Sequence, residues 1–218
     1  MHPQAHGENS ARQEAFTLVE LLVVIAVIGV LMSLLFPVYG SIQESARRLK
    51  AKNDVTQLVT AVNAYFTEYG AYPIAPPAPG EPATEVSFMT SNSDLLNVLQ
   101  AVPEGANSDD ALNPKQIAFI RVPDVASSAL PRSGIFHGNW YDPWGPQPGK
   151  PESGIYHVRI DGSYIGKVTN PYPGFDDDDD WKHQGGPPPM INQGVIAWSV
   201  ARTGETTYEL RDQIVSYQ

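Results

Sequence analysis

A single acidic residue, Glu20, lies inside a long apolar run that covers residues 16–38. The run reads FTLVELLVVIAVIGVLMSLLFPV, and Glu20 is its only charged residue. An uncompensated ionised side chain at the centre of a bilayer costs at least about 2.5 to 3.5 kcal/mol. No basic residue follows before Arg47, so a charge partner would come from another chain or from a new amino terminus near Phe16. Alternatively, Glu20 is near enough to one end of the run to extend to the membrane interface.

The run itself has the length of a membrane span. Roughly 20 apolar residues in a helix match the ~30 Å hydrocarbon thickness of a bilayer. A cleaved secretory signal has an apolar stretch of only about 7 to 15 residues, followed by a small-residue cleavage site that is missing here. We therefore predict a transmembrane and assembly helix over residues 16–38, with Gly29 and Pro37 as its flexible positions.

The sequence AFTLVELLVVIAVIGVL, followed by Pro37, resembles the leader junction and first helix of type IV pilins and type II secretion pseudopilins. The resemblance is strongest from Ala15 to about Tyr72. In that family a membrane aspartyl peptidase cuts before the phenylalanine and methylates the new amine. The resemblance implies a leader over residues 1–15, cleavage between Ala15 and Phe16, and N-methylation of Phe16. The chain departs from the family in having Ala15 where glycine is usual, and acidic residues at Glu8 and Glu14 in the leader.

The resemblance also gives Glu20 a role in assembly. The charged amine of Phe16 in one subunit would be neutralised by Glu20 of a neighbour in a low-dielectric bundle, which would set the axial register. Basic residues follow the apolar run, and by the positive-inside rule they favour that end as cytoplasmic: Arg47, Arg48, Lys50 and Lys52. The resemblance implies the opposite topology, with a cytoplasmic leader and a periplasmic head, and we follow it.

Residues 39–72 are predicted to continue the helix as an amphipathic half. Apolar residues recur there mainly at three- and four-residue steps: Ile42, Ala46, Leu49, Val55, Leu58, Val62, Tyr65 and Tyr69. Gly70 and Pro73 predict the end of the helix. The proline-rich residues 74–82 predict an extended connector.

Residues 73–218 are predicted to form a globular α+β head. Residues 94–102 have the spacing of a short helix. Four β-branched or aromatic runs predict antiparallel strands at residues 116–122, 155–160, 164–168 and 195–200. Asp161-Gly162 predicts a hairpin between the second and third of them. We expect a small sheet that packs against the amphipathic half of the long helix, which is the pilin-like arrangement.

Two further segments resemble pseudopilin heads, and both predict structural roles. They are Asp142-Pro143-Trp144-Gly145 and Ala197-Trp198-Ser199. Asp142 can cap backbone amides while Trp144 fills the end of the sheet.

Calcium is the one cofactor that the resemblance suggests. Major pseudopilins typically bind it in the C-terminal loop, and here Asp212 is the one aspartate retained of the customary pair. The run of acids from Asp176 to Asp180 is either a cation site or a solvated tract.

Composition excludes several other classes. A net charge of -10 and a pI near 4.8 argue against nucleic-acid binding. The chain has no cysteine, and it contains no HExxH, GxSxG, Walker A or GxGxxG motif, so we predict that it is not an enzyme.

The sequence therefore predicts a structural subunit of a bacterial filament. Its partners would be further copies, other pilin-like subunits, the prepilin peptidase and the inner-membrane platform of a secretion or pilus machine. It would cross the inner membrane once and polymerise into a periplasmic pseudopilus or an extracellular pilus, as a major or a minor subunit. The alternative is a membrane-anchored periplasmic module that binds glycan or divalent ions and does not polymerise.

Overall fold

The computed structural model describes residues 17–125, 131–146, 151–171, 190–200 and 213–216. The side chains of residues 34–38, 151, 152 and 213 are outside the description. The chain divides into two compact units, Met1–Ser45 and Ala46–Gln218, and each is described by itself.

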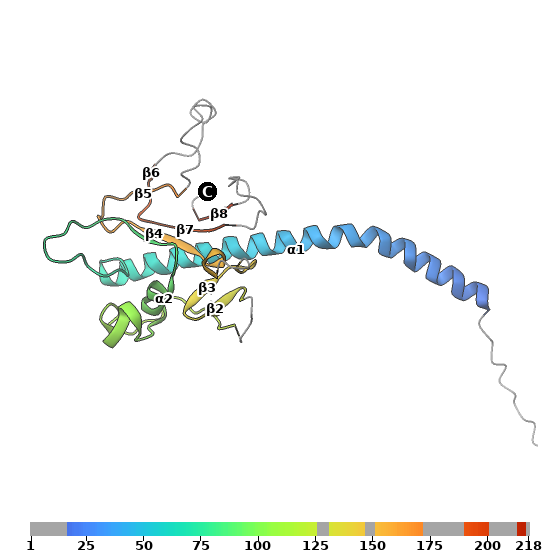
Figure 1. Cartoon of the computed structure of the whole chain (residues 1–218), viewed down its shortest axis with the longest axis horizontal. Helices are drawn as coiled ribbons and strands as arrows, with labels where there is room; N and C mark the ends of the chain where they lie inside the picture. Colours follow the sequence, from blue (N-terminus) through green and yellow to red (C-terminus); the bar gives the residue numbers. More distant parts are fainter. Residues whose placement is uncertain (1–16, 126–130, 147–150, 172–189, 201–212, 217–218) are drawn as a thin grey trace, which may run out of the picture. The chain divides into compact units, whose positions relative to one another are not determined.

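One helix, α1, runs from Leu18 to Tyr69 (Figure 1). Its predicted end is confirmed, because Gly70 follows in the left-handed conformation with φ of 69° and donates a 2.8 Å hydrogen bond to the carbonyl of Phe66. Glycine adopts this conformation without the steric cost that other residues bear. The helix assignment continues through Pro37.

In the first unit, the described apolar side chains of α1 are exposed. From Leu18 to Met32 the large apolar residues are 47–81% exposed. Among the described residues, no helix meets the length and hydropathy that a bilayer crossing requires. The membrane span over residues 16–38 therefore stays a prediction.

In the second unit, α1 packs one face against the head. Ala51, Val55, Leu58, Val62 and Tyr65 are each at most 3% exposed and form one core with the sheet and α2 (Ser93–Gln100). The predicted apolar stripe began earlier, and that part was wrong: Ile42 is 61% and Leu49 is 72% exposed. Within the second unit, the buried face of α1 starts at Ala51.

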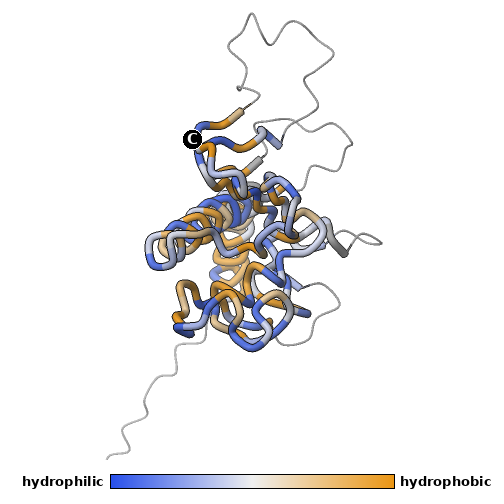
Figure 2. The backbone as a smooth tube through the Cα atoms, turned by 90° about the vertical axis from the view of Figure 1, so that its left-hand side faces the viewer, coloured by the Kyte–Doolittle hydropathy of each residue, from blue (hydrophilic) through white to orange (hydrophobic). Residues whose placement is uncertain are grey.

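Four described strands form one antiparallel sheet in the order β1-β4-β7-β8. Their bounds are Val86–Phe88, His157–Ile160, Val195–Val200 and Gln213–Val215. Successive side chains alternate between the faces, so Val158, Ile160 and Ala197 join the core with α1. Ile196 and Trp198 point to a second cluster with the short strands β5 (Val168–Thr169) and β6 (Met190–Ile191). Figure 2 colours the apolar stretches of the backbone orange.

A smaller layer covers the remaining face of the core. It holds α2, the 3-10 turns η1 (Gly105–Asp110) and η2 (Pro151–Gly154), and the hairpin of β2 (Gly134–Phe136) and β3 (Asn139–Tyr141). Asn92 joins these parts, because its buried amide donates to the carbonyls of Trp140 and Tyr156 and accepts from the Trp140 amide at 2.9 Å.

These elements confirm the α+β class, the predicted short helix, and the strands at 155–160 and 195–200 in their main part. The strand predicted at 116–122 was wrong. Gln116 has a φ of 52°, and the amides of Phe119 and Ile120 both donate to the Leu99 carbonyl at the end of α2. This run therefore packs as a loop over α2.

The hairpin predicted at Asp161-Gly162 was also wrong. The Asp161 carboxylate accepts hydrogen bonds from the Ser163 amide at 3.0 Å, the Ser163 hydroxyl at 2.7 Å and the Gly166 amide at 2.6 Å. This side-chain turn bends residues 161–167 away from β4, so only Val168 of the predicted strand 164–168 is in β5. The neighbours of β4 are β1 and β7.

His157 is a buried titratable group in the sheet. It is 8% exposed, it stacks on Trp198 with ring centroids 5.4 Å apart, and its Nδ1 has no hydrogen-bond partner. Burial lowers the pKa of His157 to about 4, because the charged imidazolium loses its hydration. The stability that this neutral histidine contributes is therefore present above its unfolded pKa near 6.5 and is lost as the pH falls through 4.

We predict that His157→Phe, which keeps the ring stack but cannot ionise, removes this pH dependence. The free energy of unfolding of the variant should gain up to about 3 kcal/mol on that of the wild type between pH 7 and pH 4. Urea unfolding followed by tryptophan fluorescence at several pH values measures this difference. A difference that stays constant with pH would show that His157 does not titrate in this range.

Candidate assembly interface

The amino-terminal end of α1 is closed by a reciprocal pair of hydrogen bonds between Thr17 and Glu20. The Thr17 amide and hydroxyl donate to Oε2 of Glu20 at 2.8 and 2.7 Å, and the Glu20 amide donates back to the Thr17 hydroxyl at 3.2 Å. This is a capping box, in which each side chain satisfies a backbone N–H that the first turn of a helix leaves free.

The capping box changes how the acid in the apolar run is understood. Sequence reasoning considered a partner from another chain or an interfacial position, and it missed the partner three residues away. The signal was present in the spacing Thr17-x-x-Glu20. Only Oε2 accepts hydrogen bonds within the described residues, so Oε1 remains for a donor beyond them.

The residues of the predicted processing site, Ala15 and Phe16, lie just before this capping box and outside the described residues. Cleavage and N-methylation at these positions stay predictions. Gly29 lies within α1, and a Cβ placed on it would meet nothing within 4 Å. The flexible roles of Gly29 and Pro37 also stay predictions.

The first unit of α1 offers apolar surface on all sides. Consecutive residues such as Leu21, Leu22, Val23 and Val24 are each at least 50% exposed, and consecutive positions lie 100° apart around a helix. The hydroxyl of Ser33 is satisfied within the helix by the Val30 carbonyl at 2.7 Å. A helix that is apolar all round is one that is buried, either in lipid or among other helices.

In the second unit, charged side chains of α1 fasten the helix to the sheet. Tyr156 donates to the buried carboxylate of Asp54 at 2.8 Å, and Lys50 forms an ion pair with the same carboxylate at 3.2 Å. Burial, followed by the nearby Asp54 charge, raises the pKa of Tyr156, so its hydroxyl stays a donor. Lys52 donates to the Val215 carbonyl in β8 at 2.6 Å. Of the lysines that sequence reasoning used only for topology, Lys52 therefore joins α1 to β8, and Lys50 pairs with Asp54 within α1.

Asp142 joins the two head segments that sequence analysis singled out. Its Oδ1 accepts from the amides of Trp144 at 2.9 Å and Gly145 at 2.8 Å, and its Oδ2 accepts from the Ser199 hydroxyl at 2.6 Å. Trp144 is 6% exposed and belongs to the core. The capping role of Asp142 and the packing role of Trp144 are confirmed, and the bond to Ser199 fixes this turn to β7.

Burial raises the pKa of Asp142 to about 6, although the bonds from Ser199, Gly145 and Trp144 act in the opposite direction. A carboxyl whose folded pKa is raised contributes stability below its unfolded pKa of 3.8 and loses that contribution as the pH rises through 6. At neutral pH the buried charge is therefore held in place by its three donors.

The residues proposed to hold calcium lie outside the description. These are Asp212 and the acids from Asp176 to Asp180. Within the described residues, no three His, Cys, Asp or Glu side chains are placed so that they could share a metal ion. Calcium binding at Asp212 stays a prediction.

The long helix and the small antiparallel sheet packed on its second half make up a pilin-like α+β fold. Residues 10–36 match the family model described as the prokaryotic N-terminal methylation motif. The type II secretion system core protein G of Pectobacterium carotovorum is 28% identical over 140 residues, which cover 62% of this chain and 90% of the relative. The same protein of Klebsiella pneumoniae is 29% identical over 136 residues, 59% of this chain and 95% of the relative.

A pilin is similar over a shorter part. The type IV major pilin protein PilA of Myxococcus xanthus is 34% identical over 61 residues, which are 28% of each chain. No solved structure matches the chain. The chain carries the prepilin methylation motif and is homologous to type II secretion core protein G pseudopilins and type IV pilins, which confirms the resemblance found in the sequence.

We predict that Asp142→Ala lowers the free energy of unfolding by about 3 kcal/mol at pH 7, because three buried donors lose their acceptor at about 1 kcal/mol or more each. Asp142→Asn should lose much less, since its carbonyl can accept from both amides and its NH₂ can donate to Ser199. The control is Asp124→Ala at an exposed aspartate, which should change stability by less than about 0.5 kcal/mol. Equal losses for the Ala and Asn variants would contradict this account.

Proposed function

We propose that the chain is a structural subunit that polymerises into a type II secretion pseudopilus or a type IV pilus-like filament. The observation that carries this proposal is the exposed apolar surface of α1 directly after a capped, part-satisfied carboxylate. The methylation motif over residues 10–36 and the homology to core protein G support it. The role is structural rather than catalytic.

Processing creates the amino terminus that takes part in assembly. The prepilin peptidase cuts between Ala15 and Phe16 and methylates the amine of Phe16. Before assembly, residues 16–38 span the bacterial inner membrane once, with the leader cytoplasmic and the head periplasmic. The filament then forms on the inner-membrane platform of the secretion or pilus machine, with further copies and other pilin-like subunits.

Assembly replaces lipid around α1 by neighbouring helices. Apolar side chains lose little in this exchange, because lipid tails are as apolar as the helices, and close packing supplies the gain. Assembly stabilises the carboxylate of Glu20 more than it stabilises the apolar side chains. Thr17 already satisfies Oε2, and the amine of Phe16 from a neighbour would reach Oε1 and neutralise the charge in a low-dielectric bundle.

Two substitutions at Glu20 distinguish the role of its negative charge from the role of its hydrogen bonds with Thr17. We predict that Glu20→Ala and Glu20→Gln both lower incorporation into filaments at least about tenfold, because neither can neutralise an amine and breaking a buried ion pair costs about 3 to 5 kcal/mol. Glutamine can still accept the Thr17 hydrogen bonds, so an active Glu20→Gln would show that the cap alone matters. Sedimentation of sheared filaments gives the assembled fraction.

Two controls test whether the substitutions impair membrane insertion and whether the loss of any acidic side chain would impair assembly. Both Glu20 variants should remain in the membrane fraction, since removing a charge from an apolar helix does not weaken insertion. Glu81→Gln removes an exposed acid of the connector and should assemble normally. Full assembly of Glu20→Ala would contradict the role of Glu20 in assembly. A wild-type chain that enters the membrane but forms no filaments would favour the alternative, in which the helix only anchors a periplasmic binding module.

The processing step has its own test. Mass spectrometry of the protein from cells that contain a prepilin peptidase should find N-methylated Phe16 as the first residue. A mature protein that still begins at Met1 would contradict the proposed function.

A further inference from the structure

The short strands β5 and β6 cover part of the sheet face that points away from α1, and we call these four residues, 168–169 and 190–191, the strap. Among the described residues the two strands pair with each other and with no strand of the main sheet. Their inner side chains, Val168 and Ile191, are buried in one cluster with three side chains of the sheet: Ile196, Trp198 and Val215. Strands of two residues are too short to be stable by themselves, so the strap depends on what holds it to the sheet.

An ion pair next to the strap holds the backbone of β5 at one residue. The pair joins Glu85, which precedes β1, to Arg159 of β4, with Oε1 and Nε 3.1 Å apart. Oε2 of Glu85 accepts from the Thr169 amide at 2.5 Å, and Nη1 of Arg159 donates to the Thr169 carbonyl at 2.8 Å. The two side chains therefore take both backbone groups of Thr169, as a neighbouring strand would.

Arg159 is held in this position from two further directions. Its guanidinium lies over the ring of Trp198, with Cζ 5.6 Å from the ring centroid, and its Nε also donates to the Ser87 hydroxyl at 3.0 Å. The side chain of Arg159 is 12% exposed and that of Glu85 is 26% exposed. Because the pair faces water on one side, its attraction depends on the ionic strength of the solvent.

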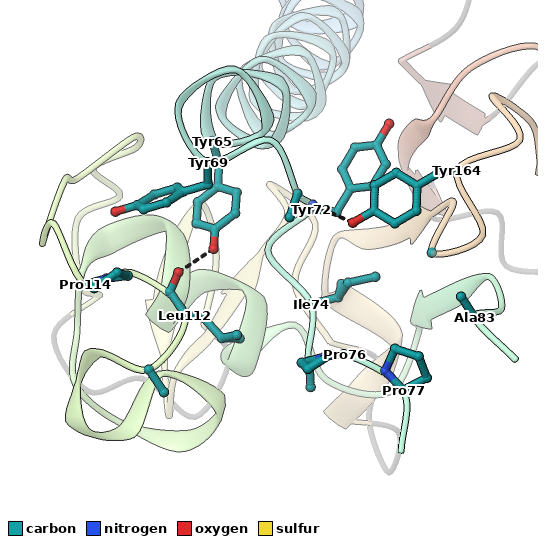
Figure 3. A pocket seen from close by; sticks show the side chains of 14 residues that line it. Tyr65, Tyr69, Tyr72, Ile74, Pro76, Pro77, Ala83, Leu112, Pro114 and Tyr164 are labelled. Atoms are coloured by element: carbon teal, nitrogen blue, oxygen red, sulfur yellow. Dashed lines mark hydrogen bonds between the residues drawn. The ribbon is translucent and has the colours of Figure 1, made fainter. Parts of the chain in front are cut away.

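The other end of the strap is anchored at Asp161. On the side of β5, the Gly166 amide donates to the Asp161 carboxylate at 2.6 Å, and on the side of β6 the Asp161 amide donates to the Gly194 carbonyl at 2.8 Å. Tyr164 of the same turn stacks on Tyr72, with ring centroids 5.4 Å apart (Figure 3). A Cβ on Gly194 would lie 1.9 Å from the Tyr72 hydroxyl, so this end is closely packed. The turn at Asp161 is therefore fixed without the ion pair.

Apolar burial alone does not decide whether the strap is closed. Burying the side chains of Val168 and Ile191 gives a free energy that is similar in size to the entropic cost of ordering a few residues of backbone. Hydrogen bonds to charged groups are stronger than neutral ones, and Thr169 makes two of them. The closed position of the strap therefore depends on the charges of Glu85 and Arg159.

We propose that the Glu85–Arg159 pair is a charge-dependent latch, and that the strap opens about Asp161 without unfolding of the sheet when the pair is weakened. Opening uncovers the side chains of Ile196 and Trp198, so the head gains an exposed apolar patch. High ionic strength screens the pair and favours the open state. The latch goes beyond the proposed function and does not depend on polymerisation.

Amide hydrogen exchange of the full-length chain in detergent, measured by mass spectrometry of peptic peptides, tests the latch. Peptides with residues 167–170 should exchange at least about tenfold faster than peptides of β4 and β7, because the strap opens separately. Raising the salt from about 0.05 M to about 0.5 M should speed exchange of the strap further. Glu85→Gln keeps an acceptor for the Thr169 amide but removes the charge. It should speed exchange of the strap and abolish its salt dependence, while β4 and β7 exchange as in the wild type.

The matched control is Lys167→Gln, which removes an exposed charge beside the strap and should leave its exchange and salt dependence unchanged. Equal exchange rates of strap and sheet in the wild type would overturn the latch, because the strap would then open only when the head unfolds. A Glu85→Gln variant that speeds strap and sheet by the same factor would also overturn it, since the pair would only stabilise the head as a whole. Exchange of the strap that does not respond to salt would overturn the role of the charges.

Discussion

A carboxylate at the start of an apolar helix is the constraint on which the rest of this protein depends. Glu20 lies in a run where every neighbour favours lipid or other helices, and an ionised group there must be compensated. Thr17 supplies part of that compensation through the capping box, and it does so within one chain. The negative charge of Glu20 still needs a positive partner. In the proposed assembly, the processed amine of Phe16 from a neighbouring subunit is that partner.

The head is held on the second half of α1 by a few specific hydrogen bonds. Tyr156 of the head donates to Asp54 of α1, and Lys52 of α1 donates to the Val215 carbonyl in β8. Within the head, Asp142 holds its own turn and Ser199 of β7 together. Asp54, Tyr156, Asp142 and Ser199 are buried and have few alternative partners, so they favour one packing of the helix against the sheet.

Much of this arrangement could be predicted from sequence, because the signals concerned are local and strong. The long helix, its end at Gly70, the strand that became β7 and the capping role of Asp142 all follow from periodicity or from residues adjacent in the chain. The two wrong predictions in the head, the hairpin and the strand at 116–122, share one cause. Asp161 and Asn113 use their side chains to satisfy nearby backbone groups, which replaces a hairpin by a turn and a strand by a loop. Strands of two or three residues, such as β2, β5 and β6, are too short for a period to be visible.

The central claim is that the acid of one subunit meets the amine of another, and a cryo-electron microscopy map of the assembled filament tests it most directly. The account predicts that the Phe16 nitrogen of one subunit lies within about 4 Å of the Glu20 carboxylate of its neighbour, the distance of an ion pair. A map in which every Glu20 contacts only Thr17 of its own chain, with the neighbouring amine more than about 8 Å away, would contradict it.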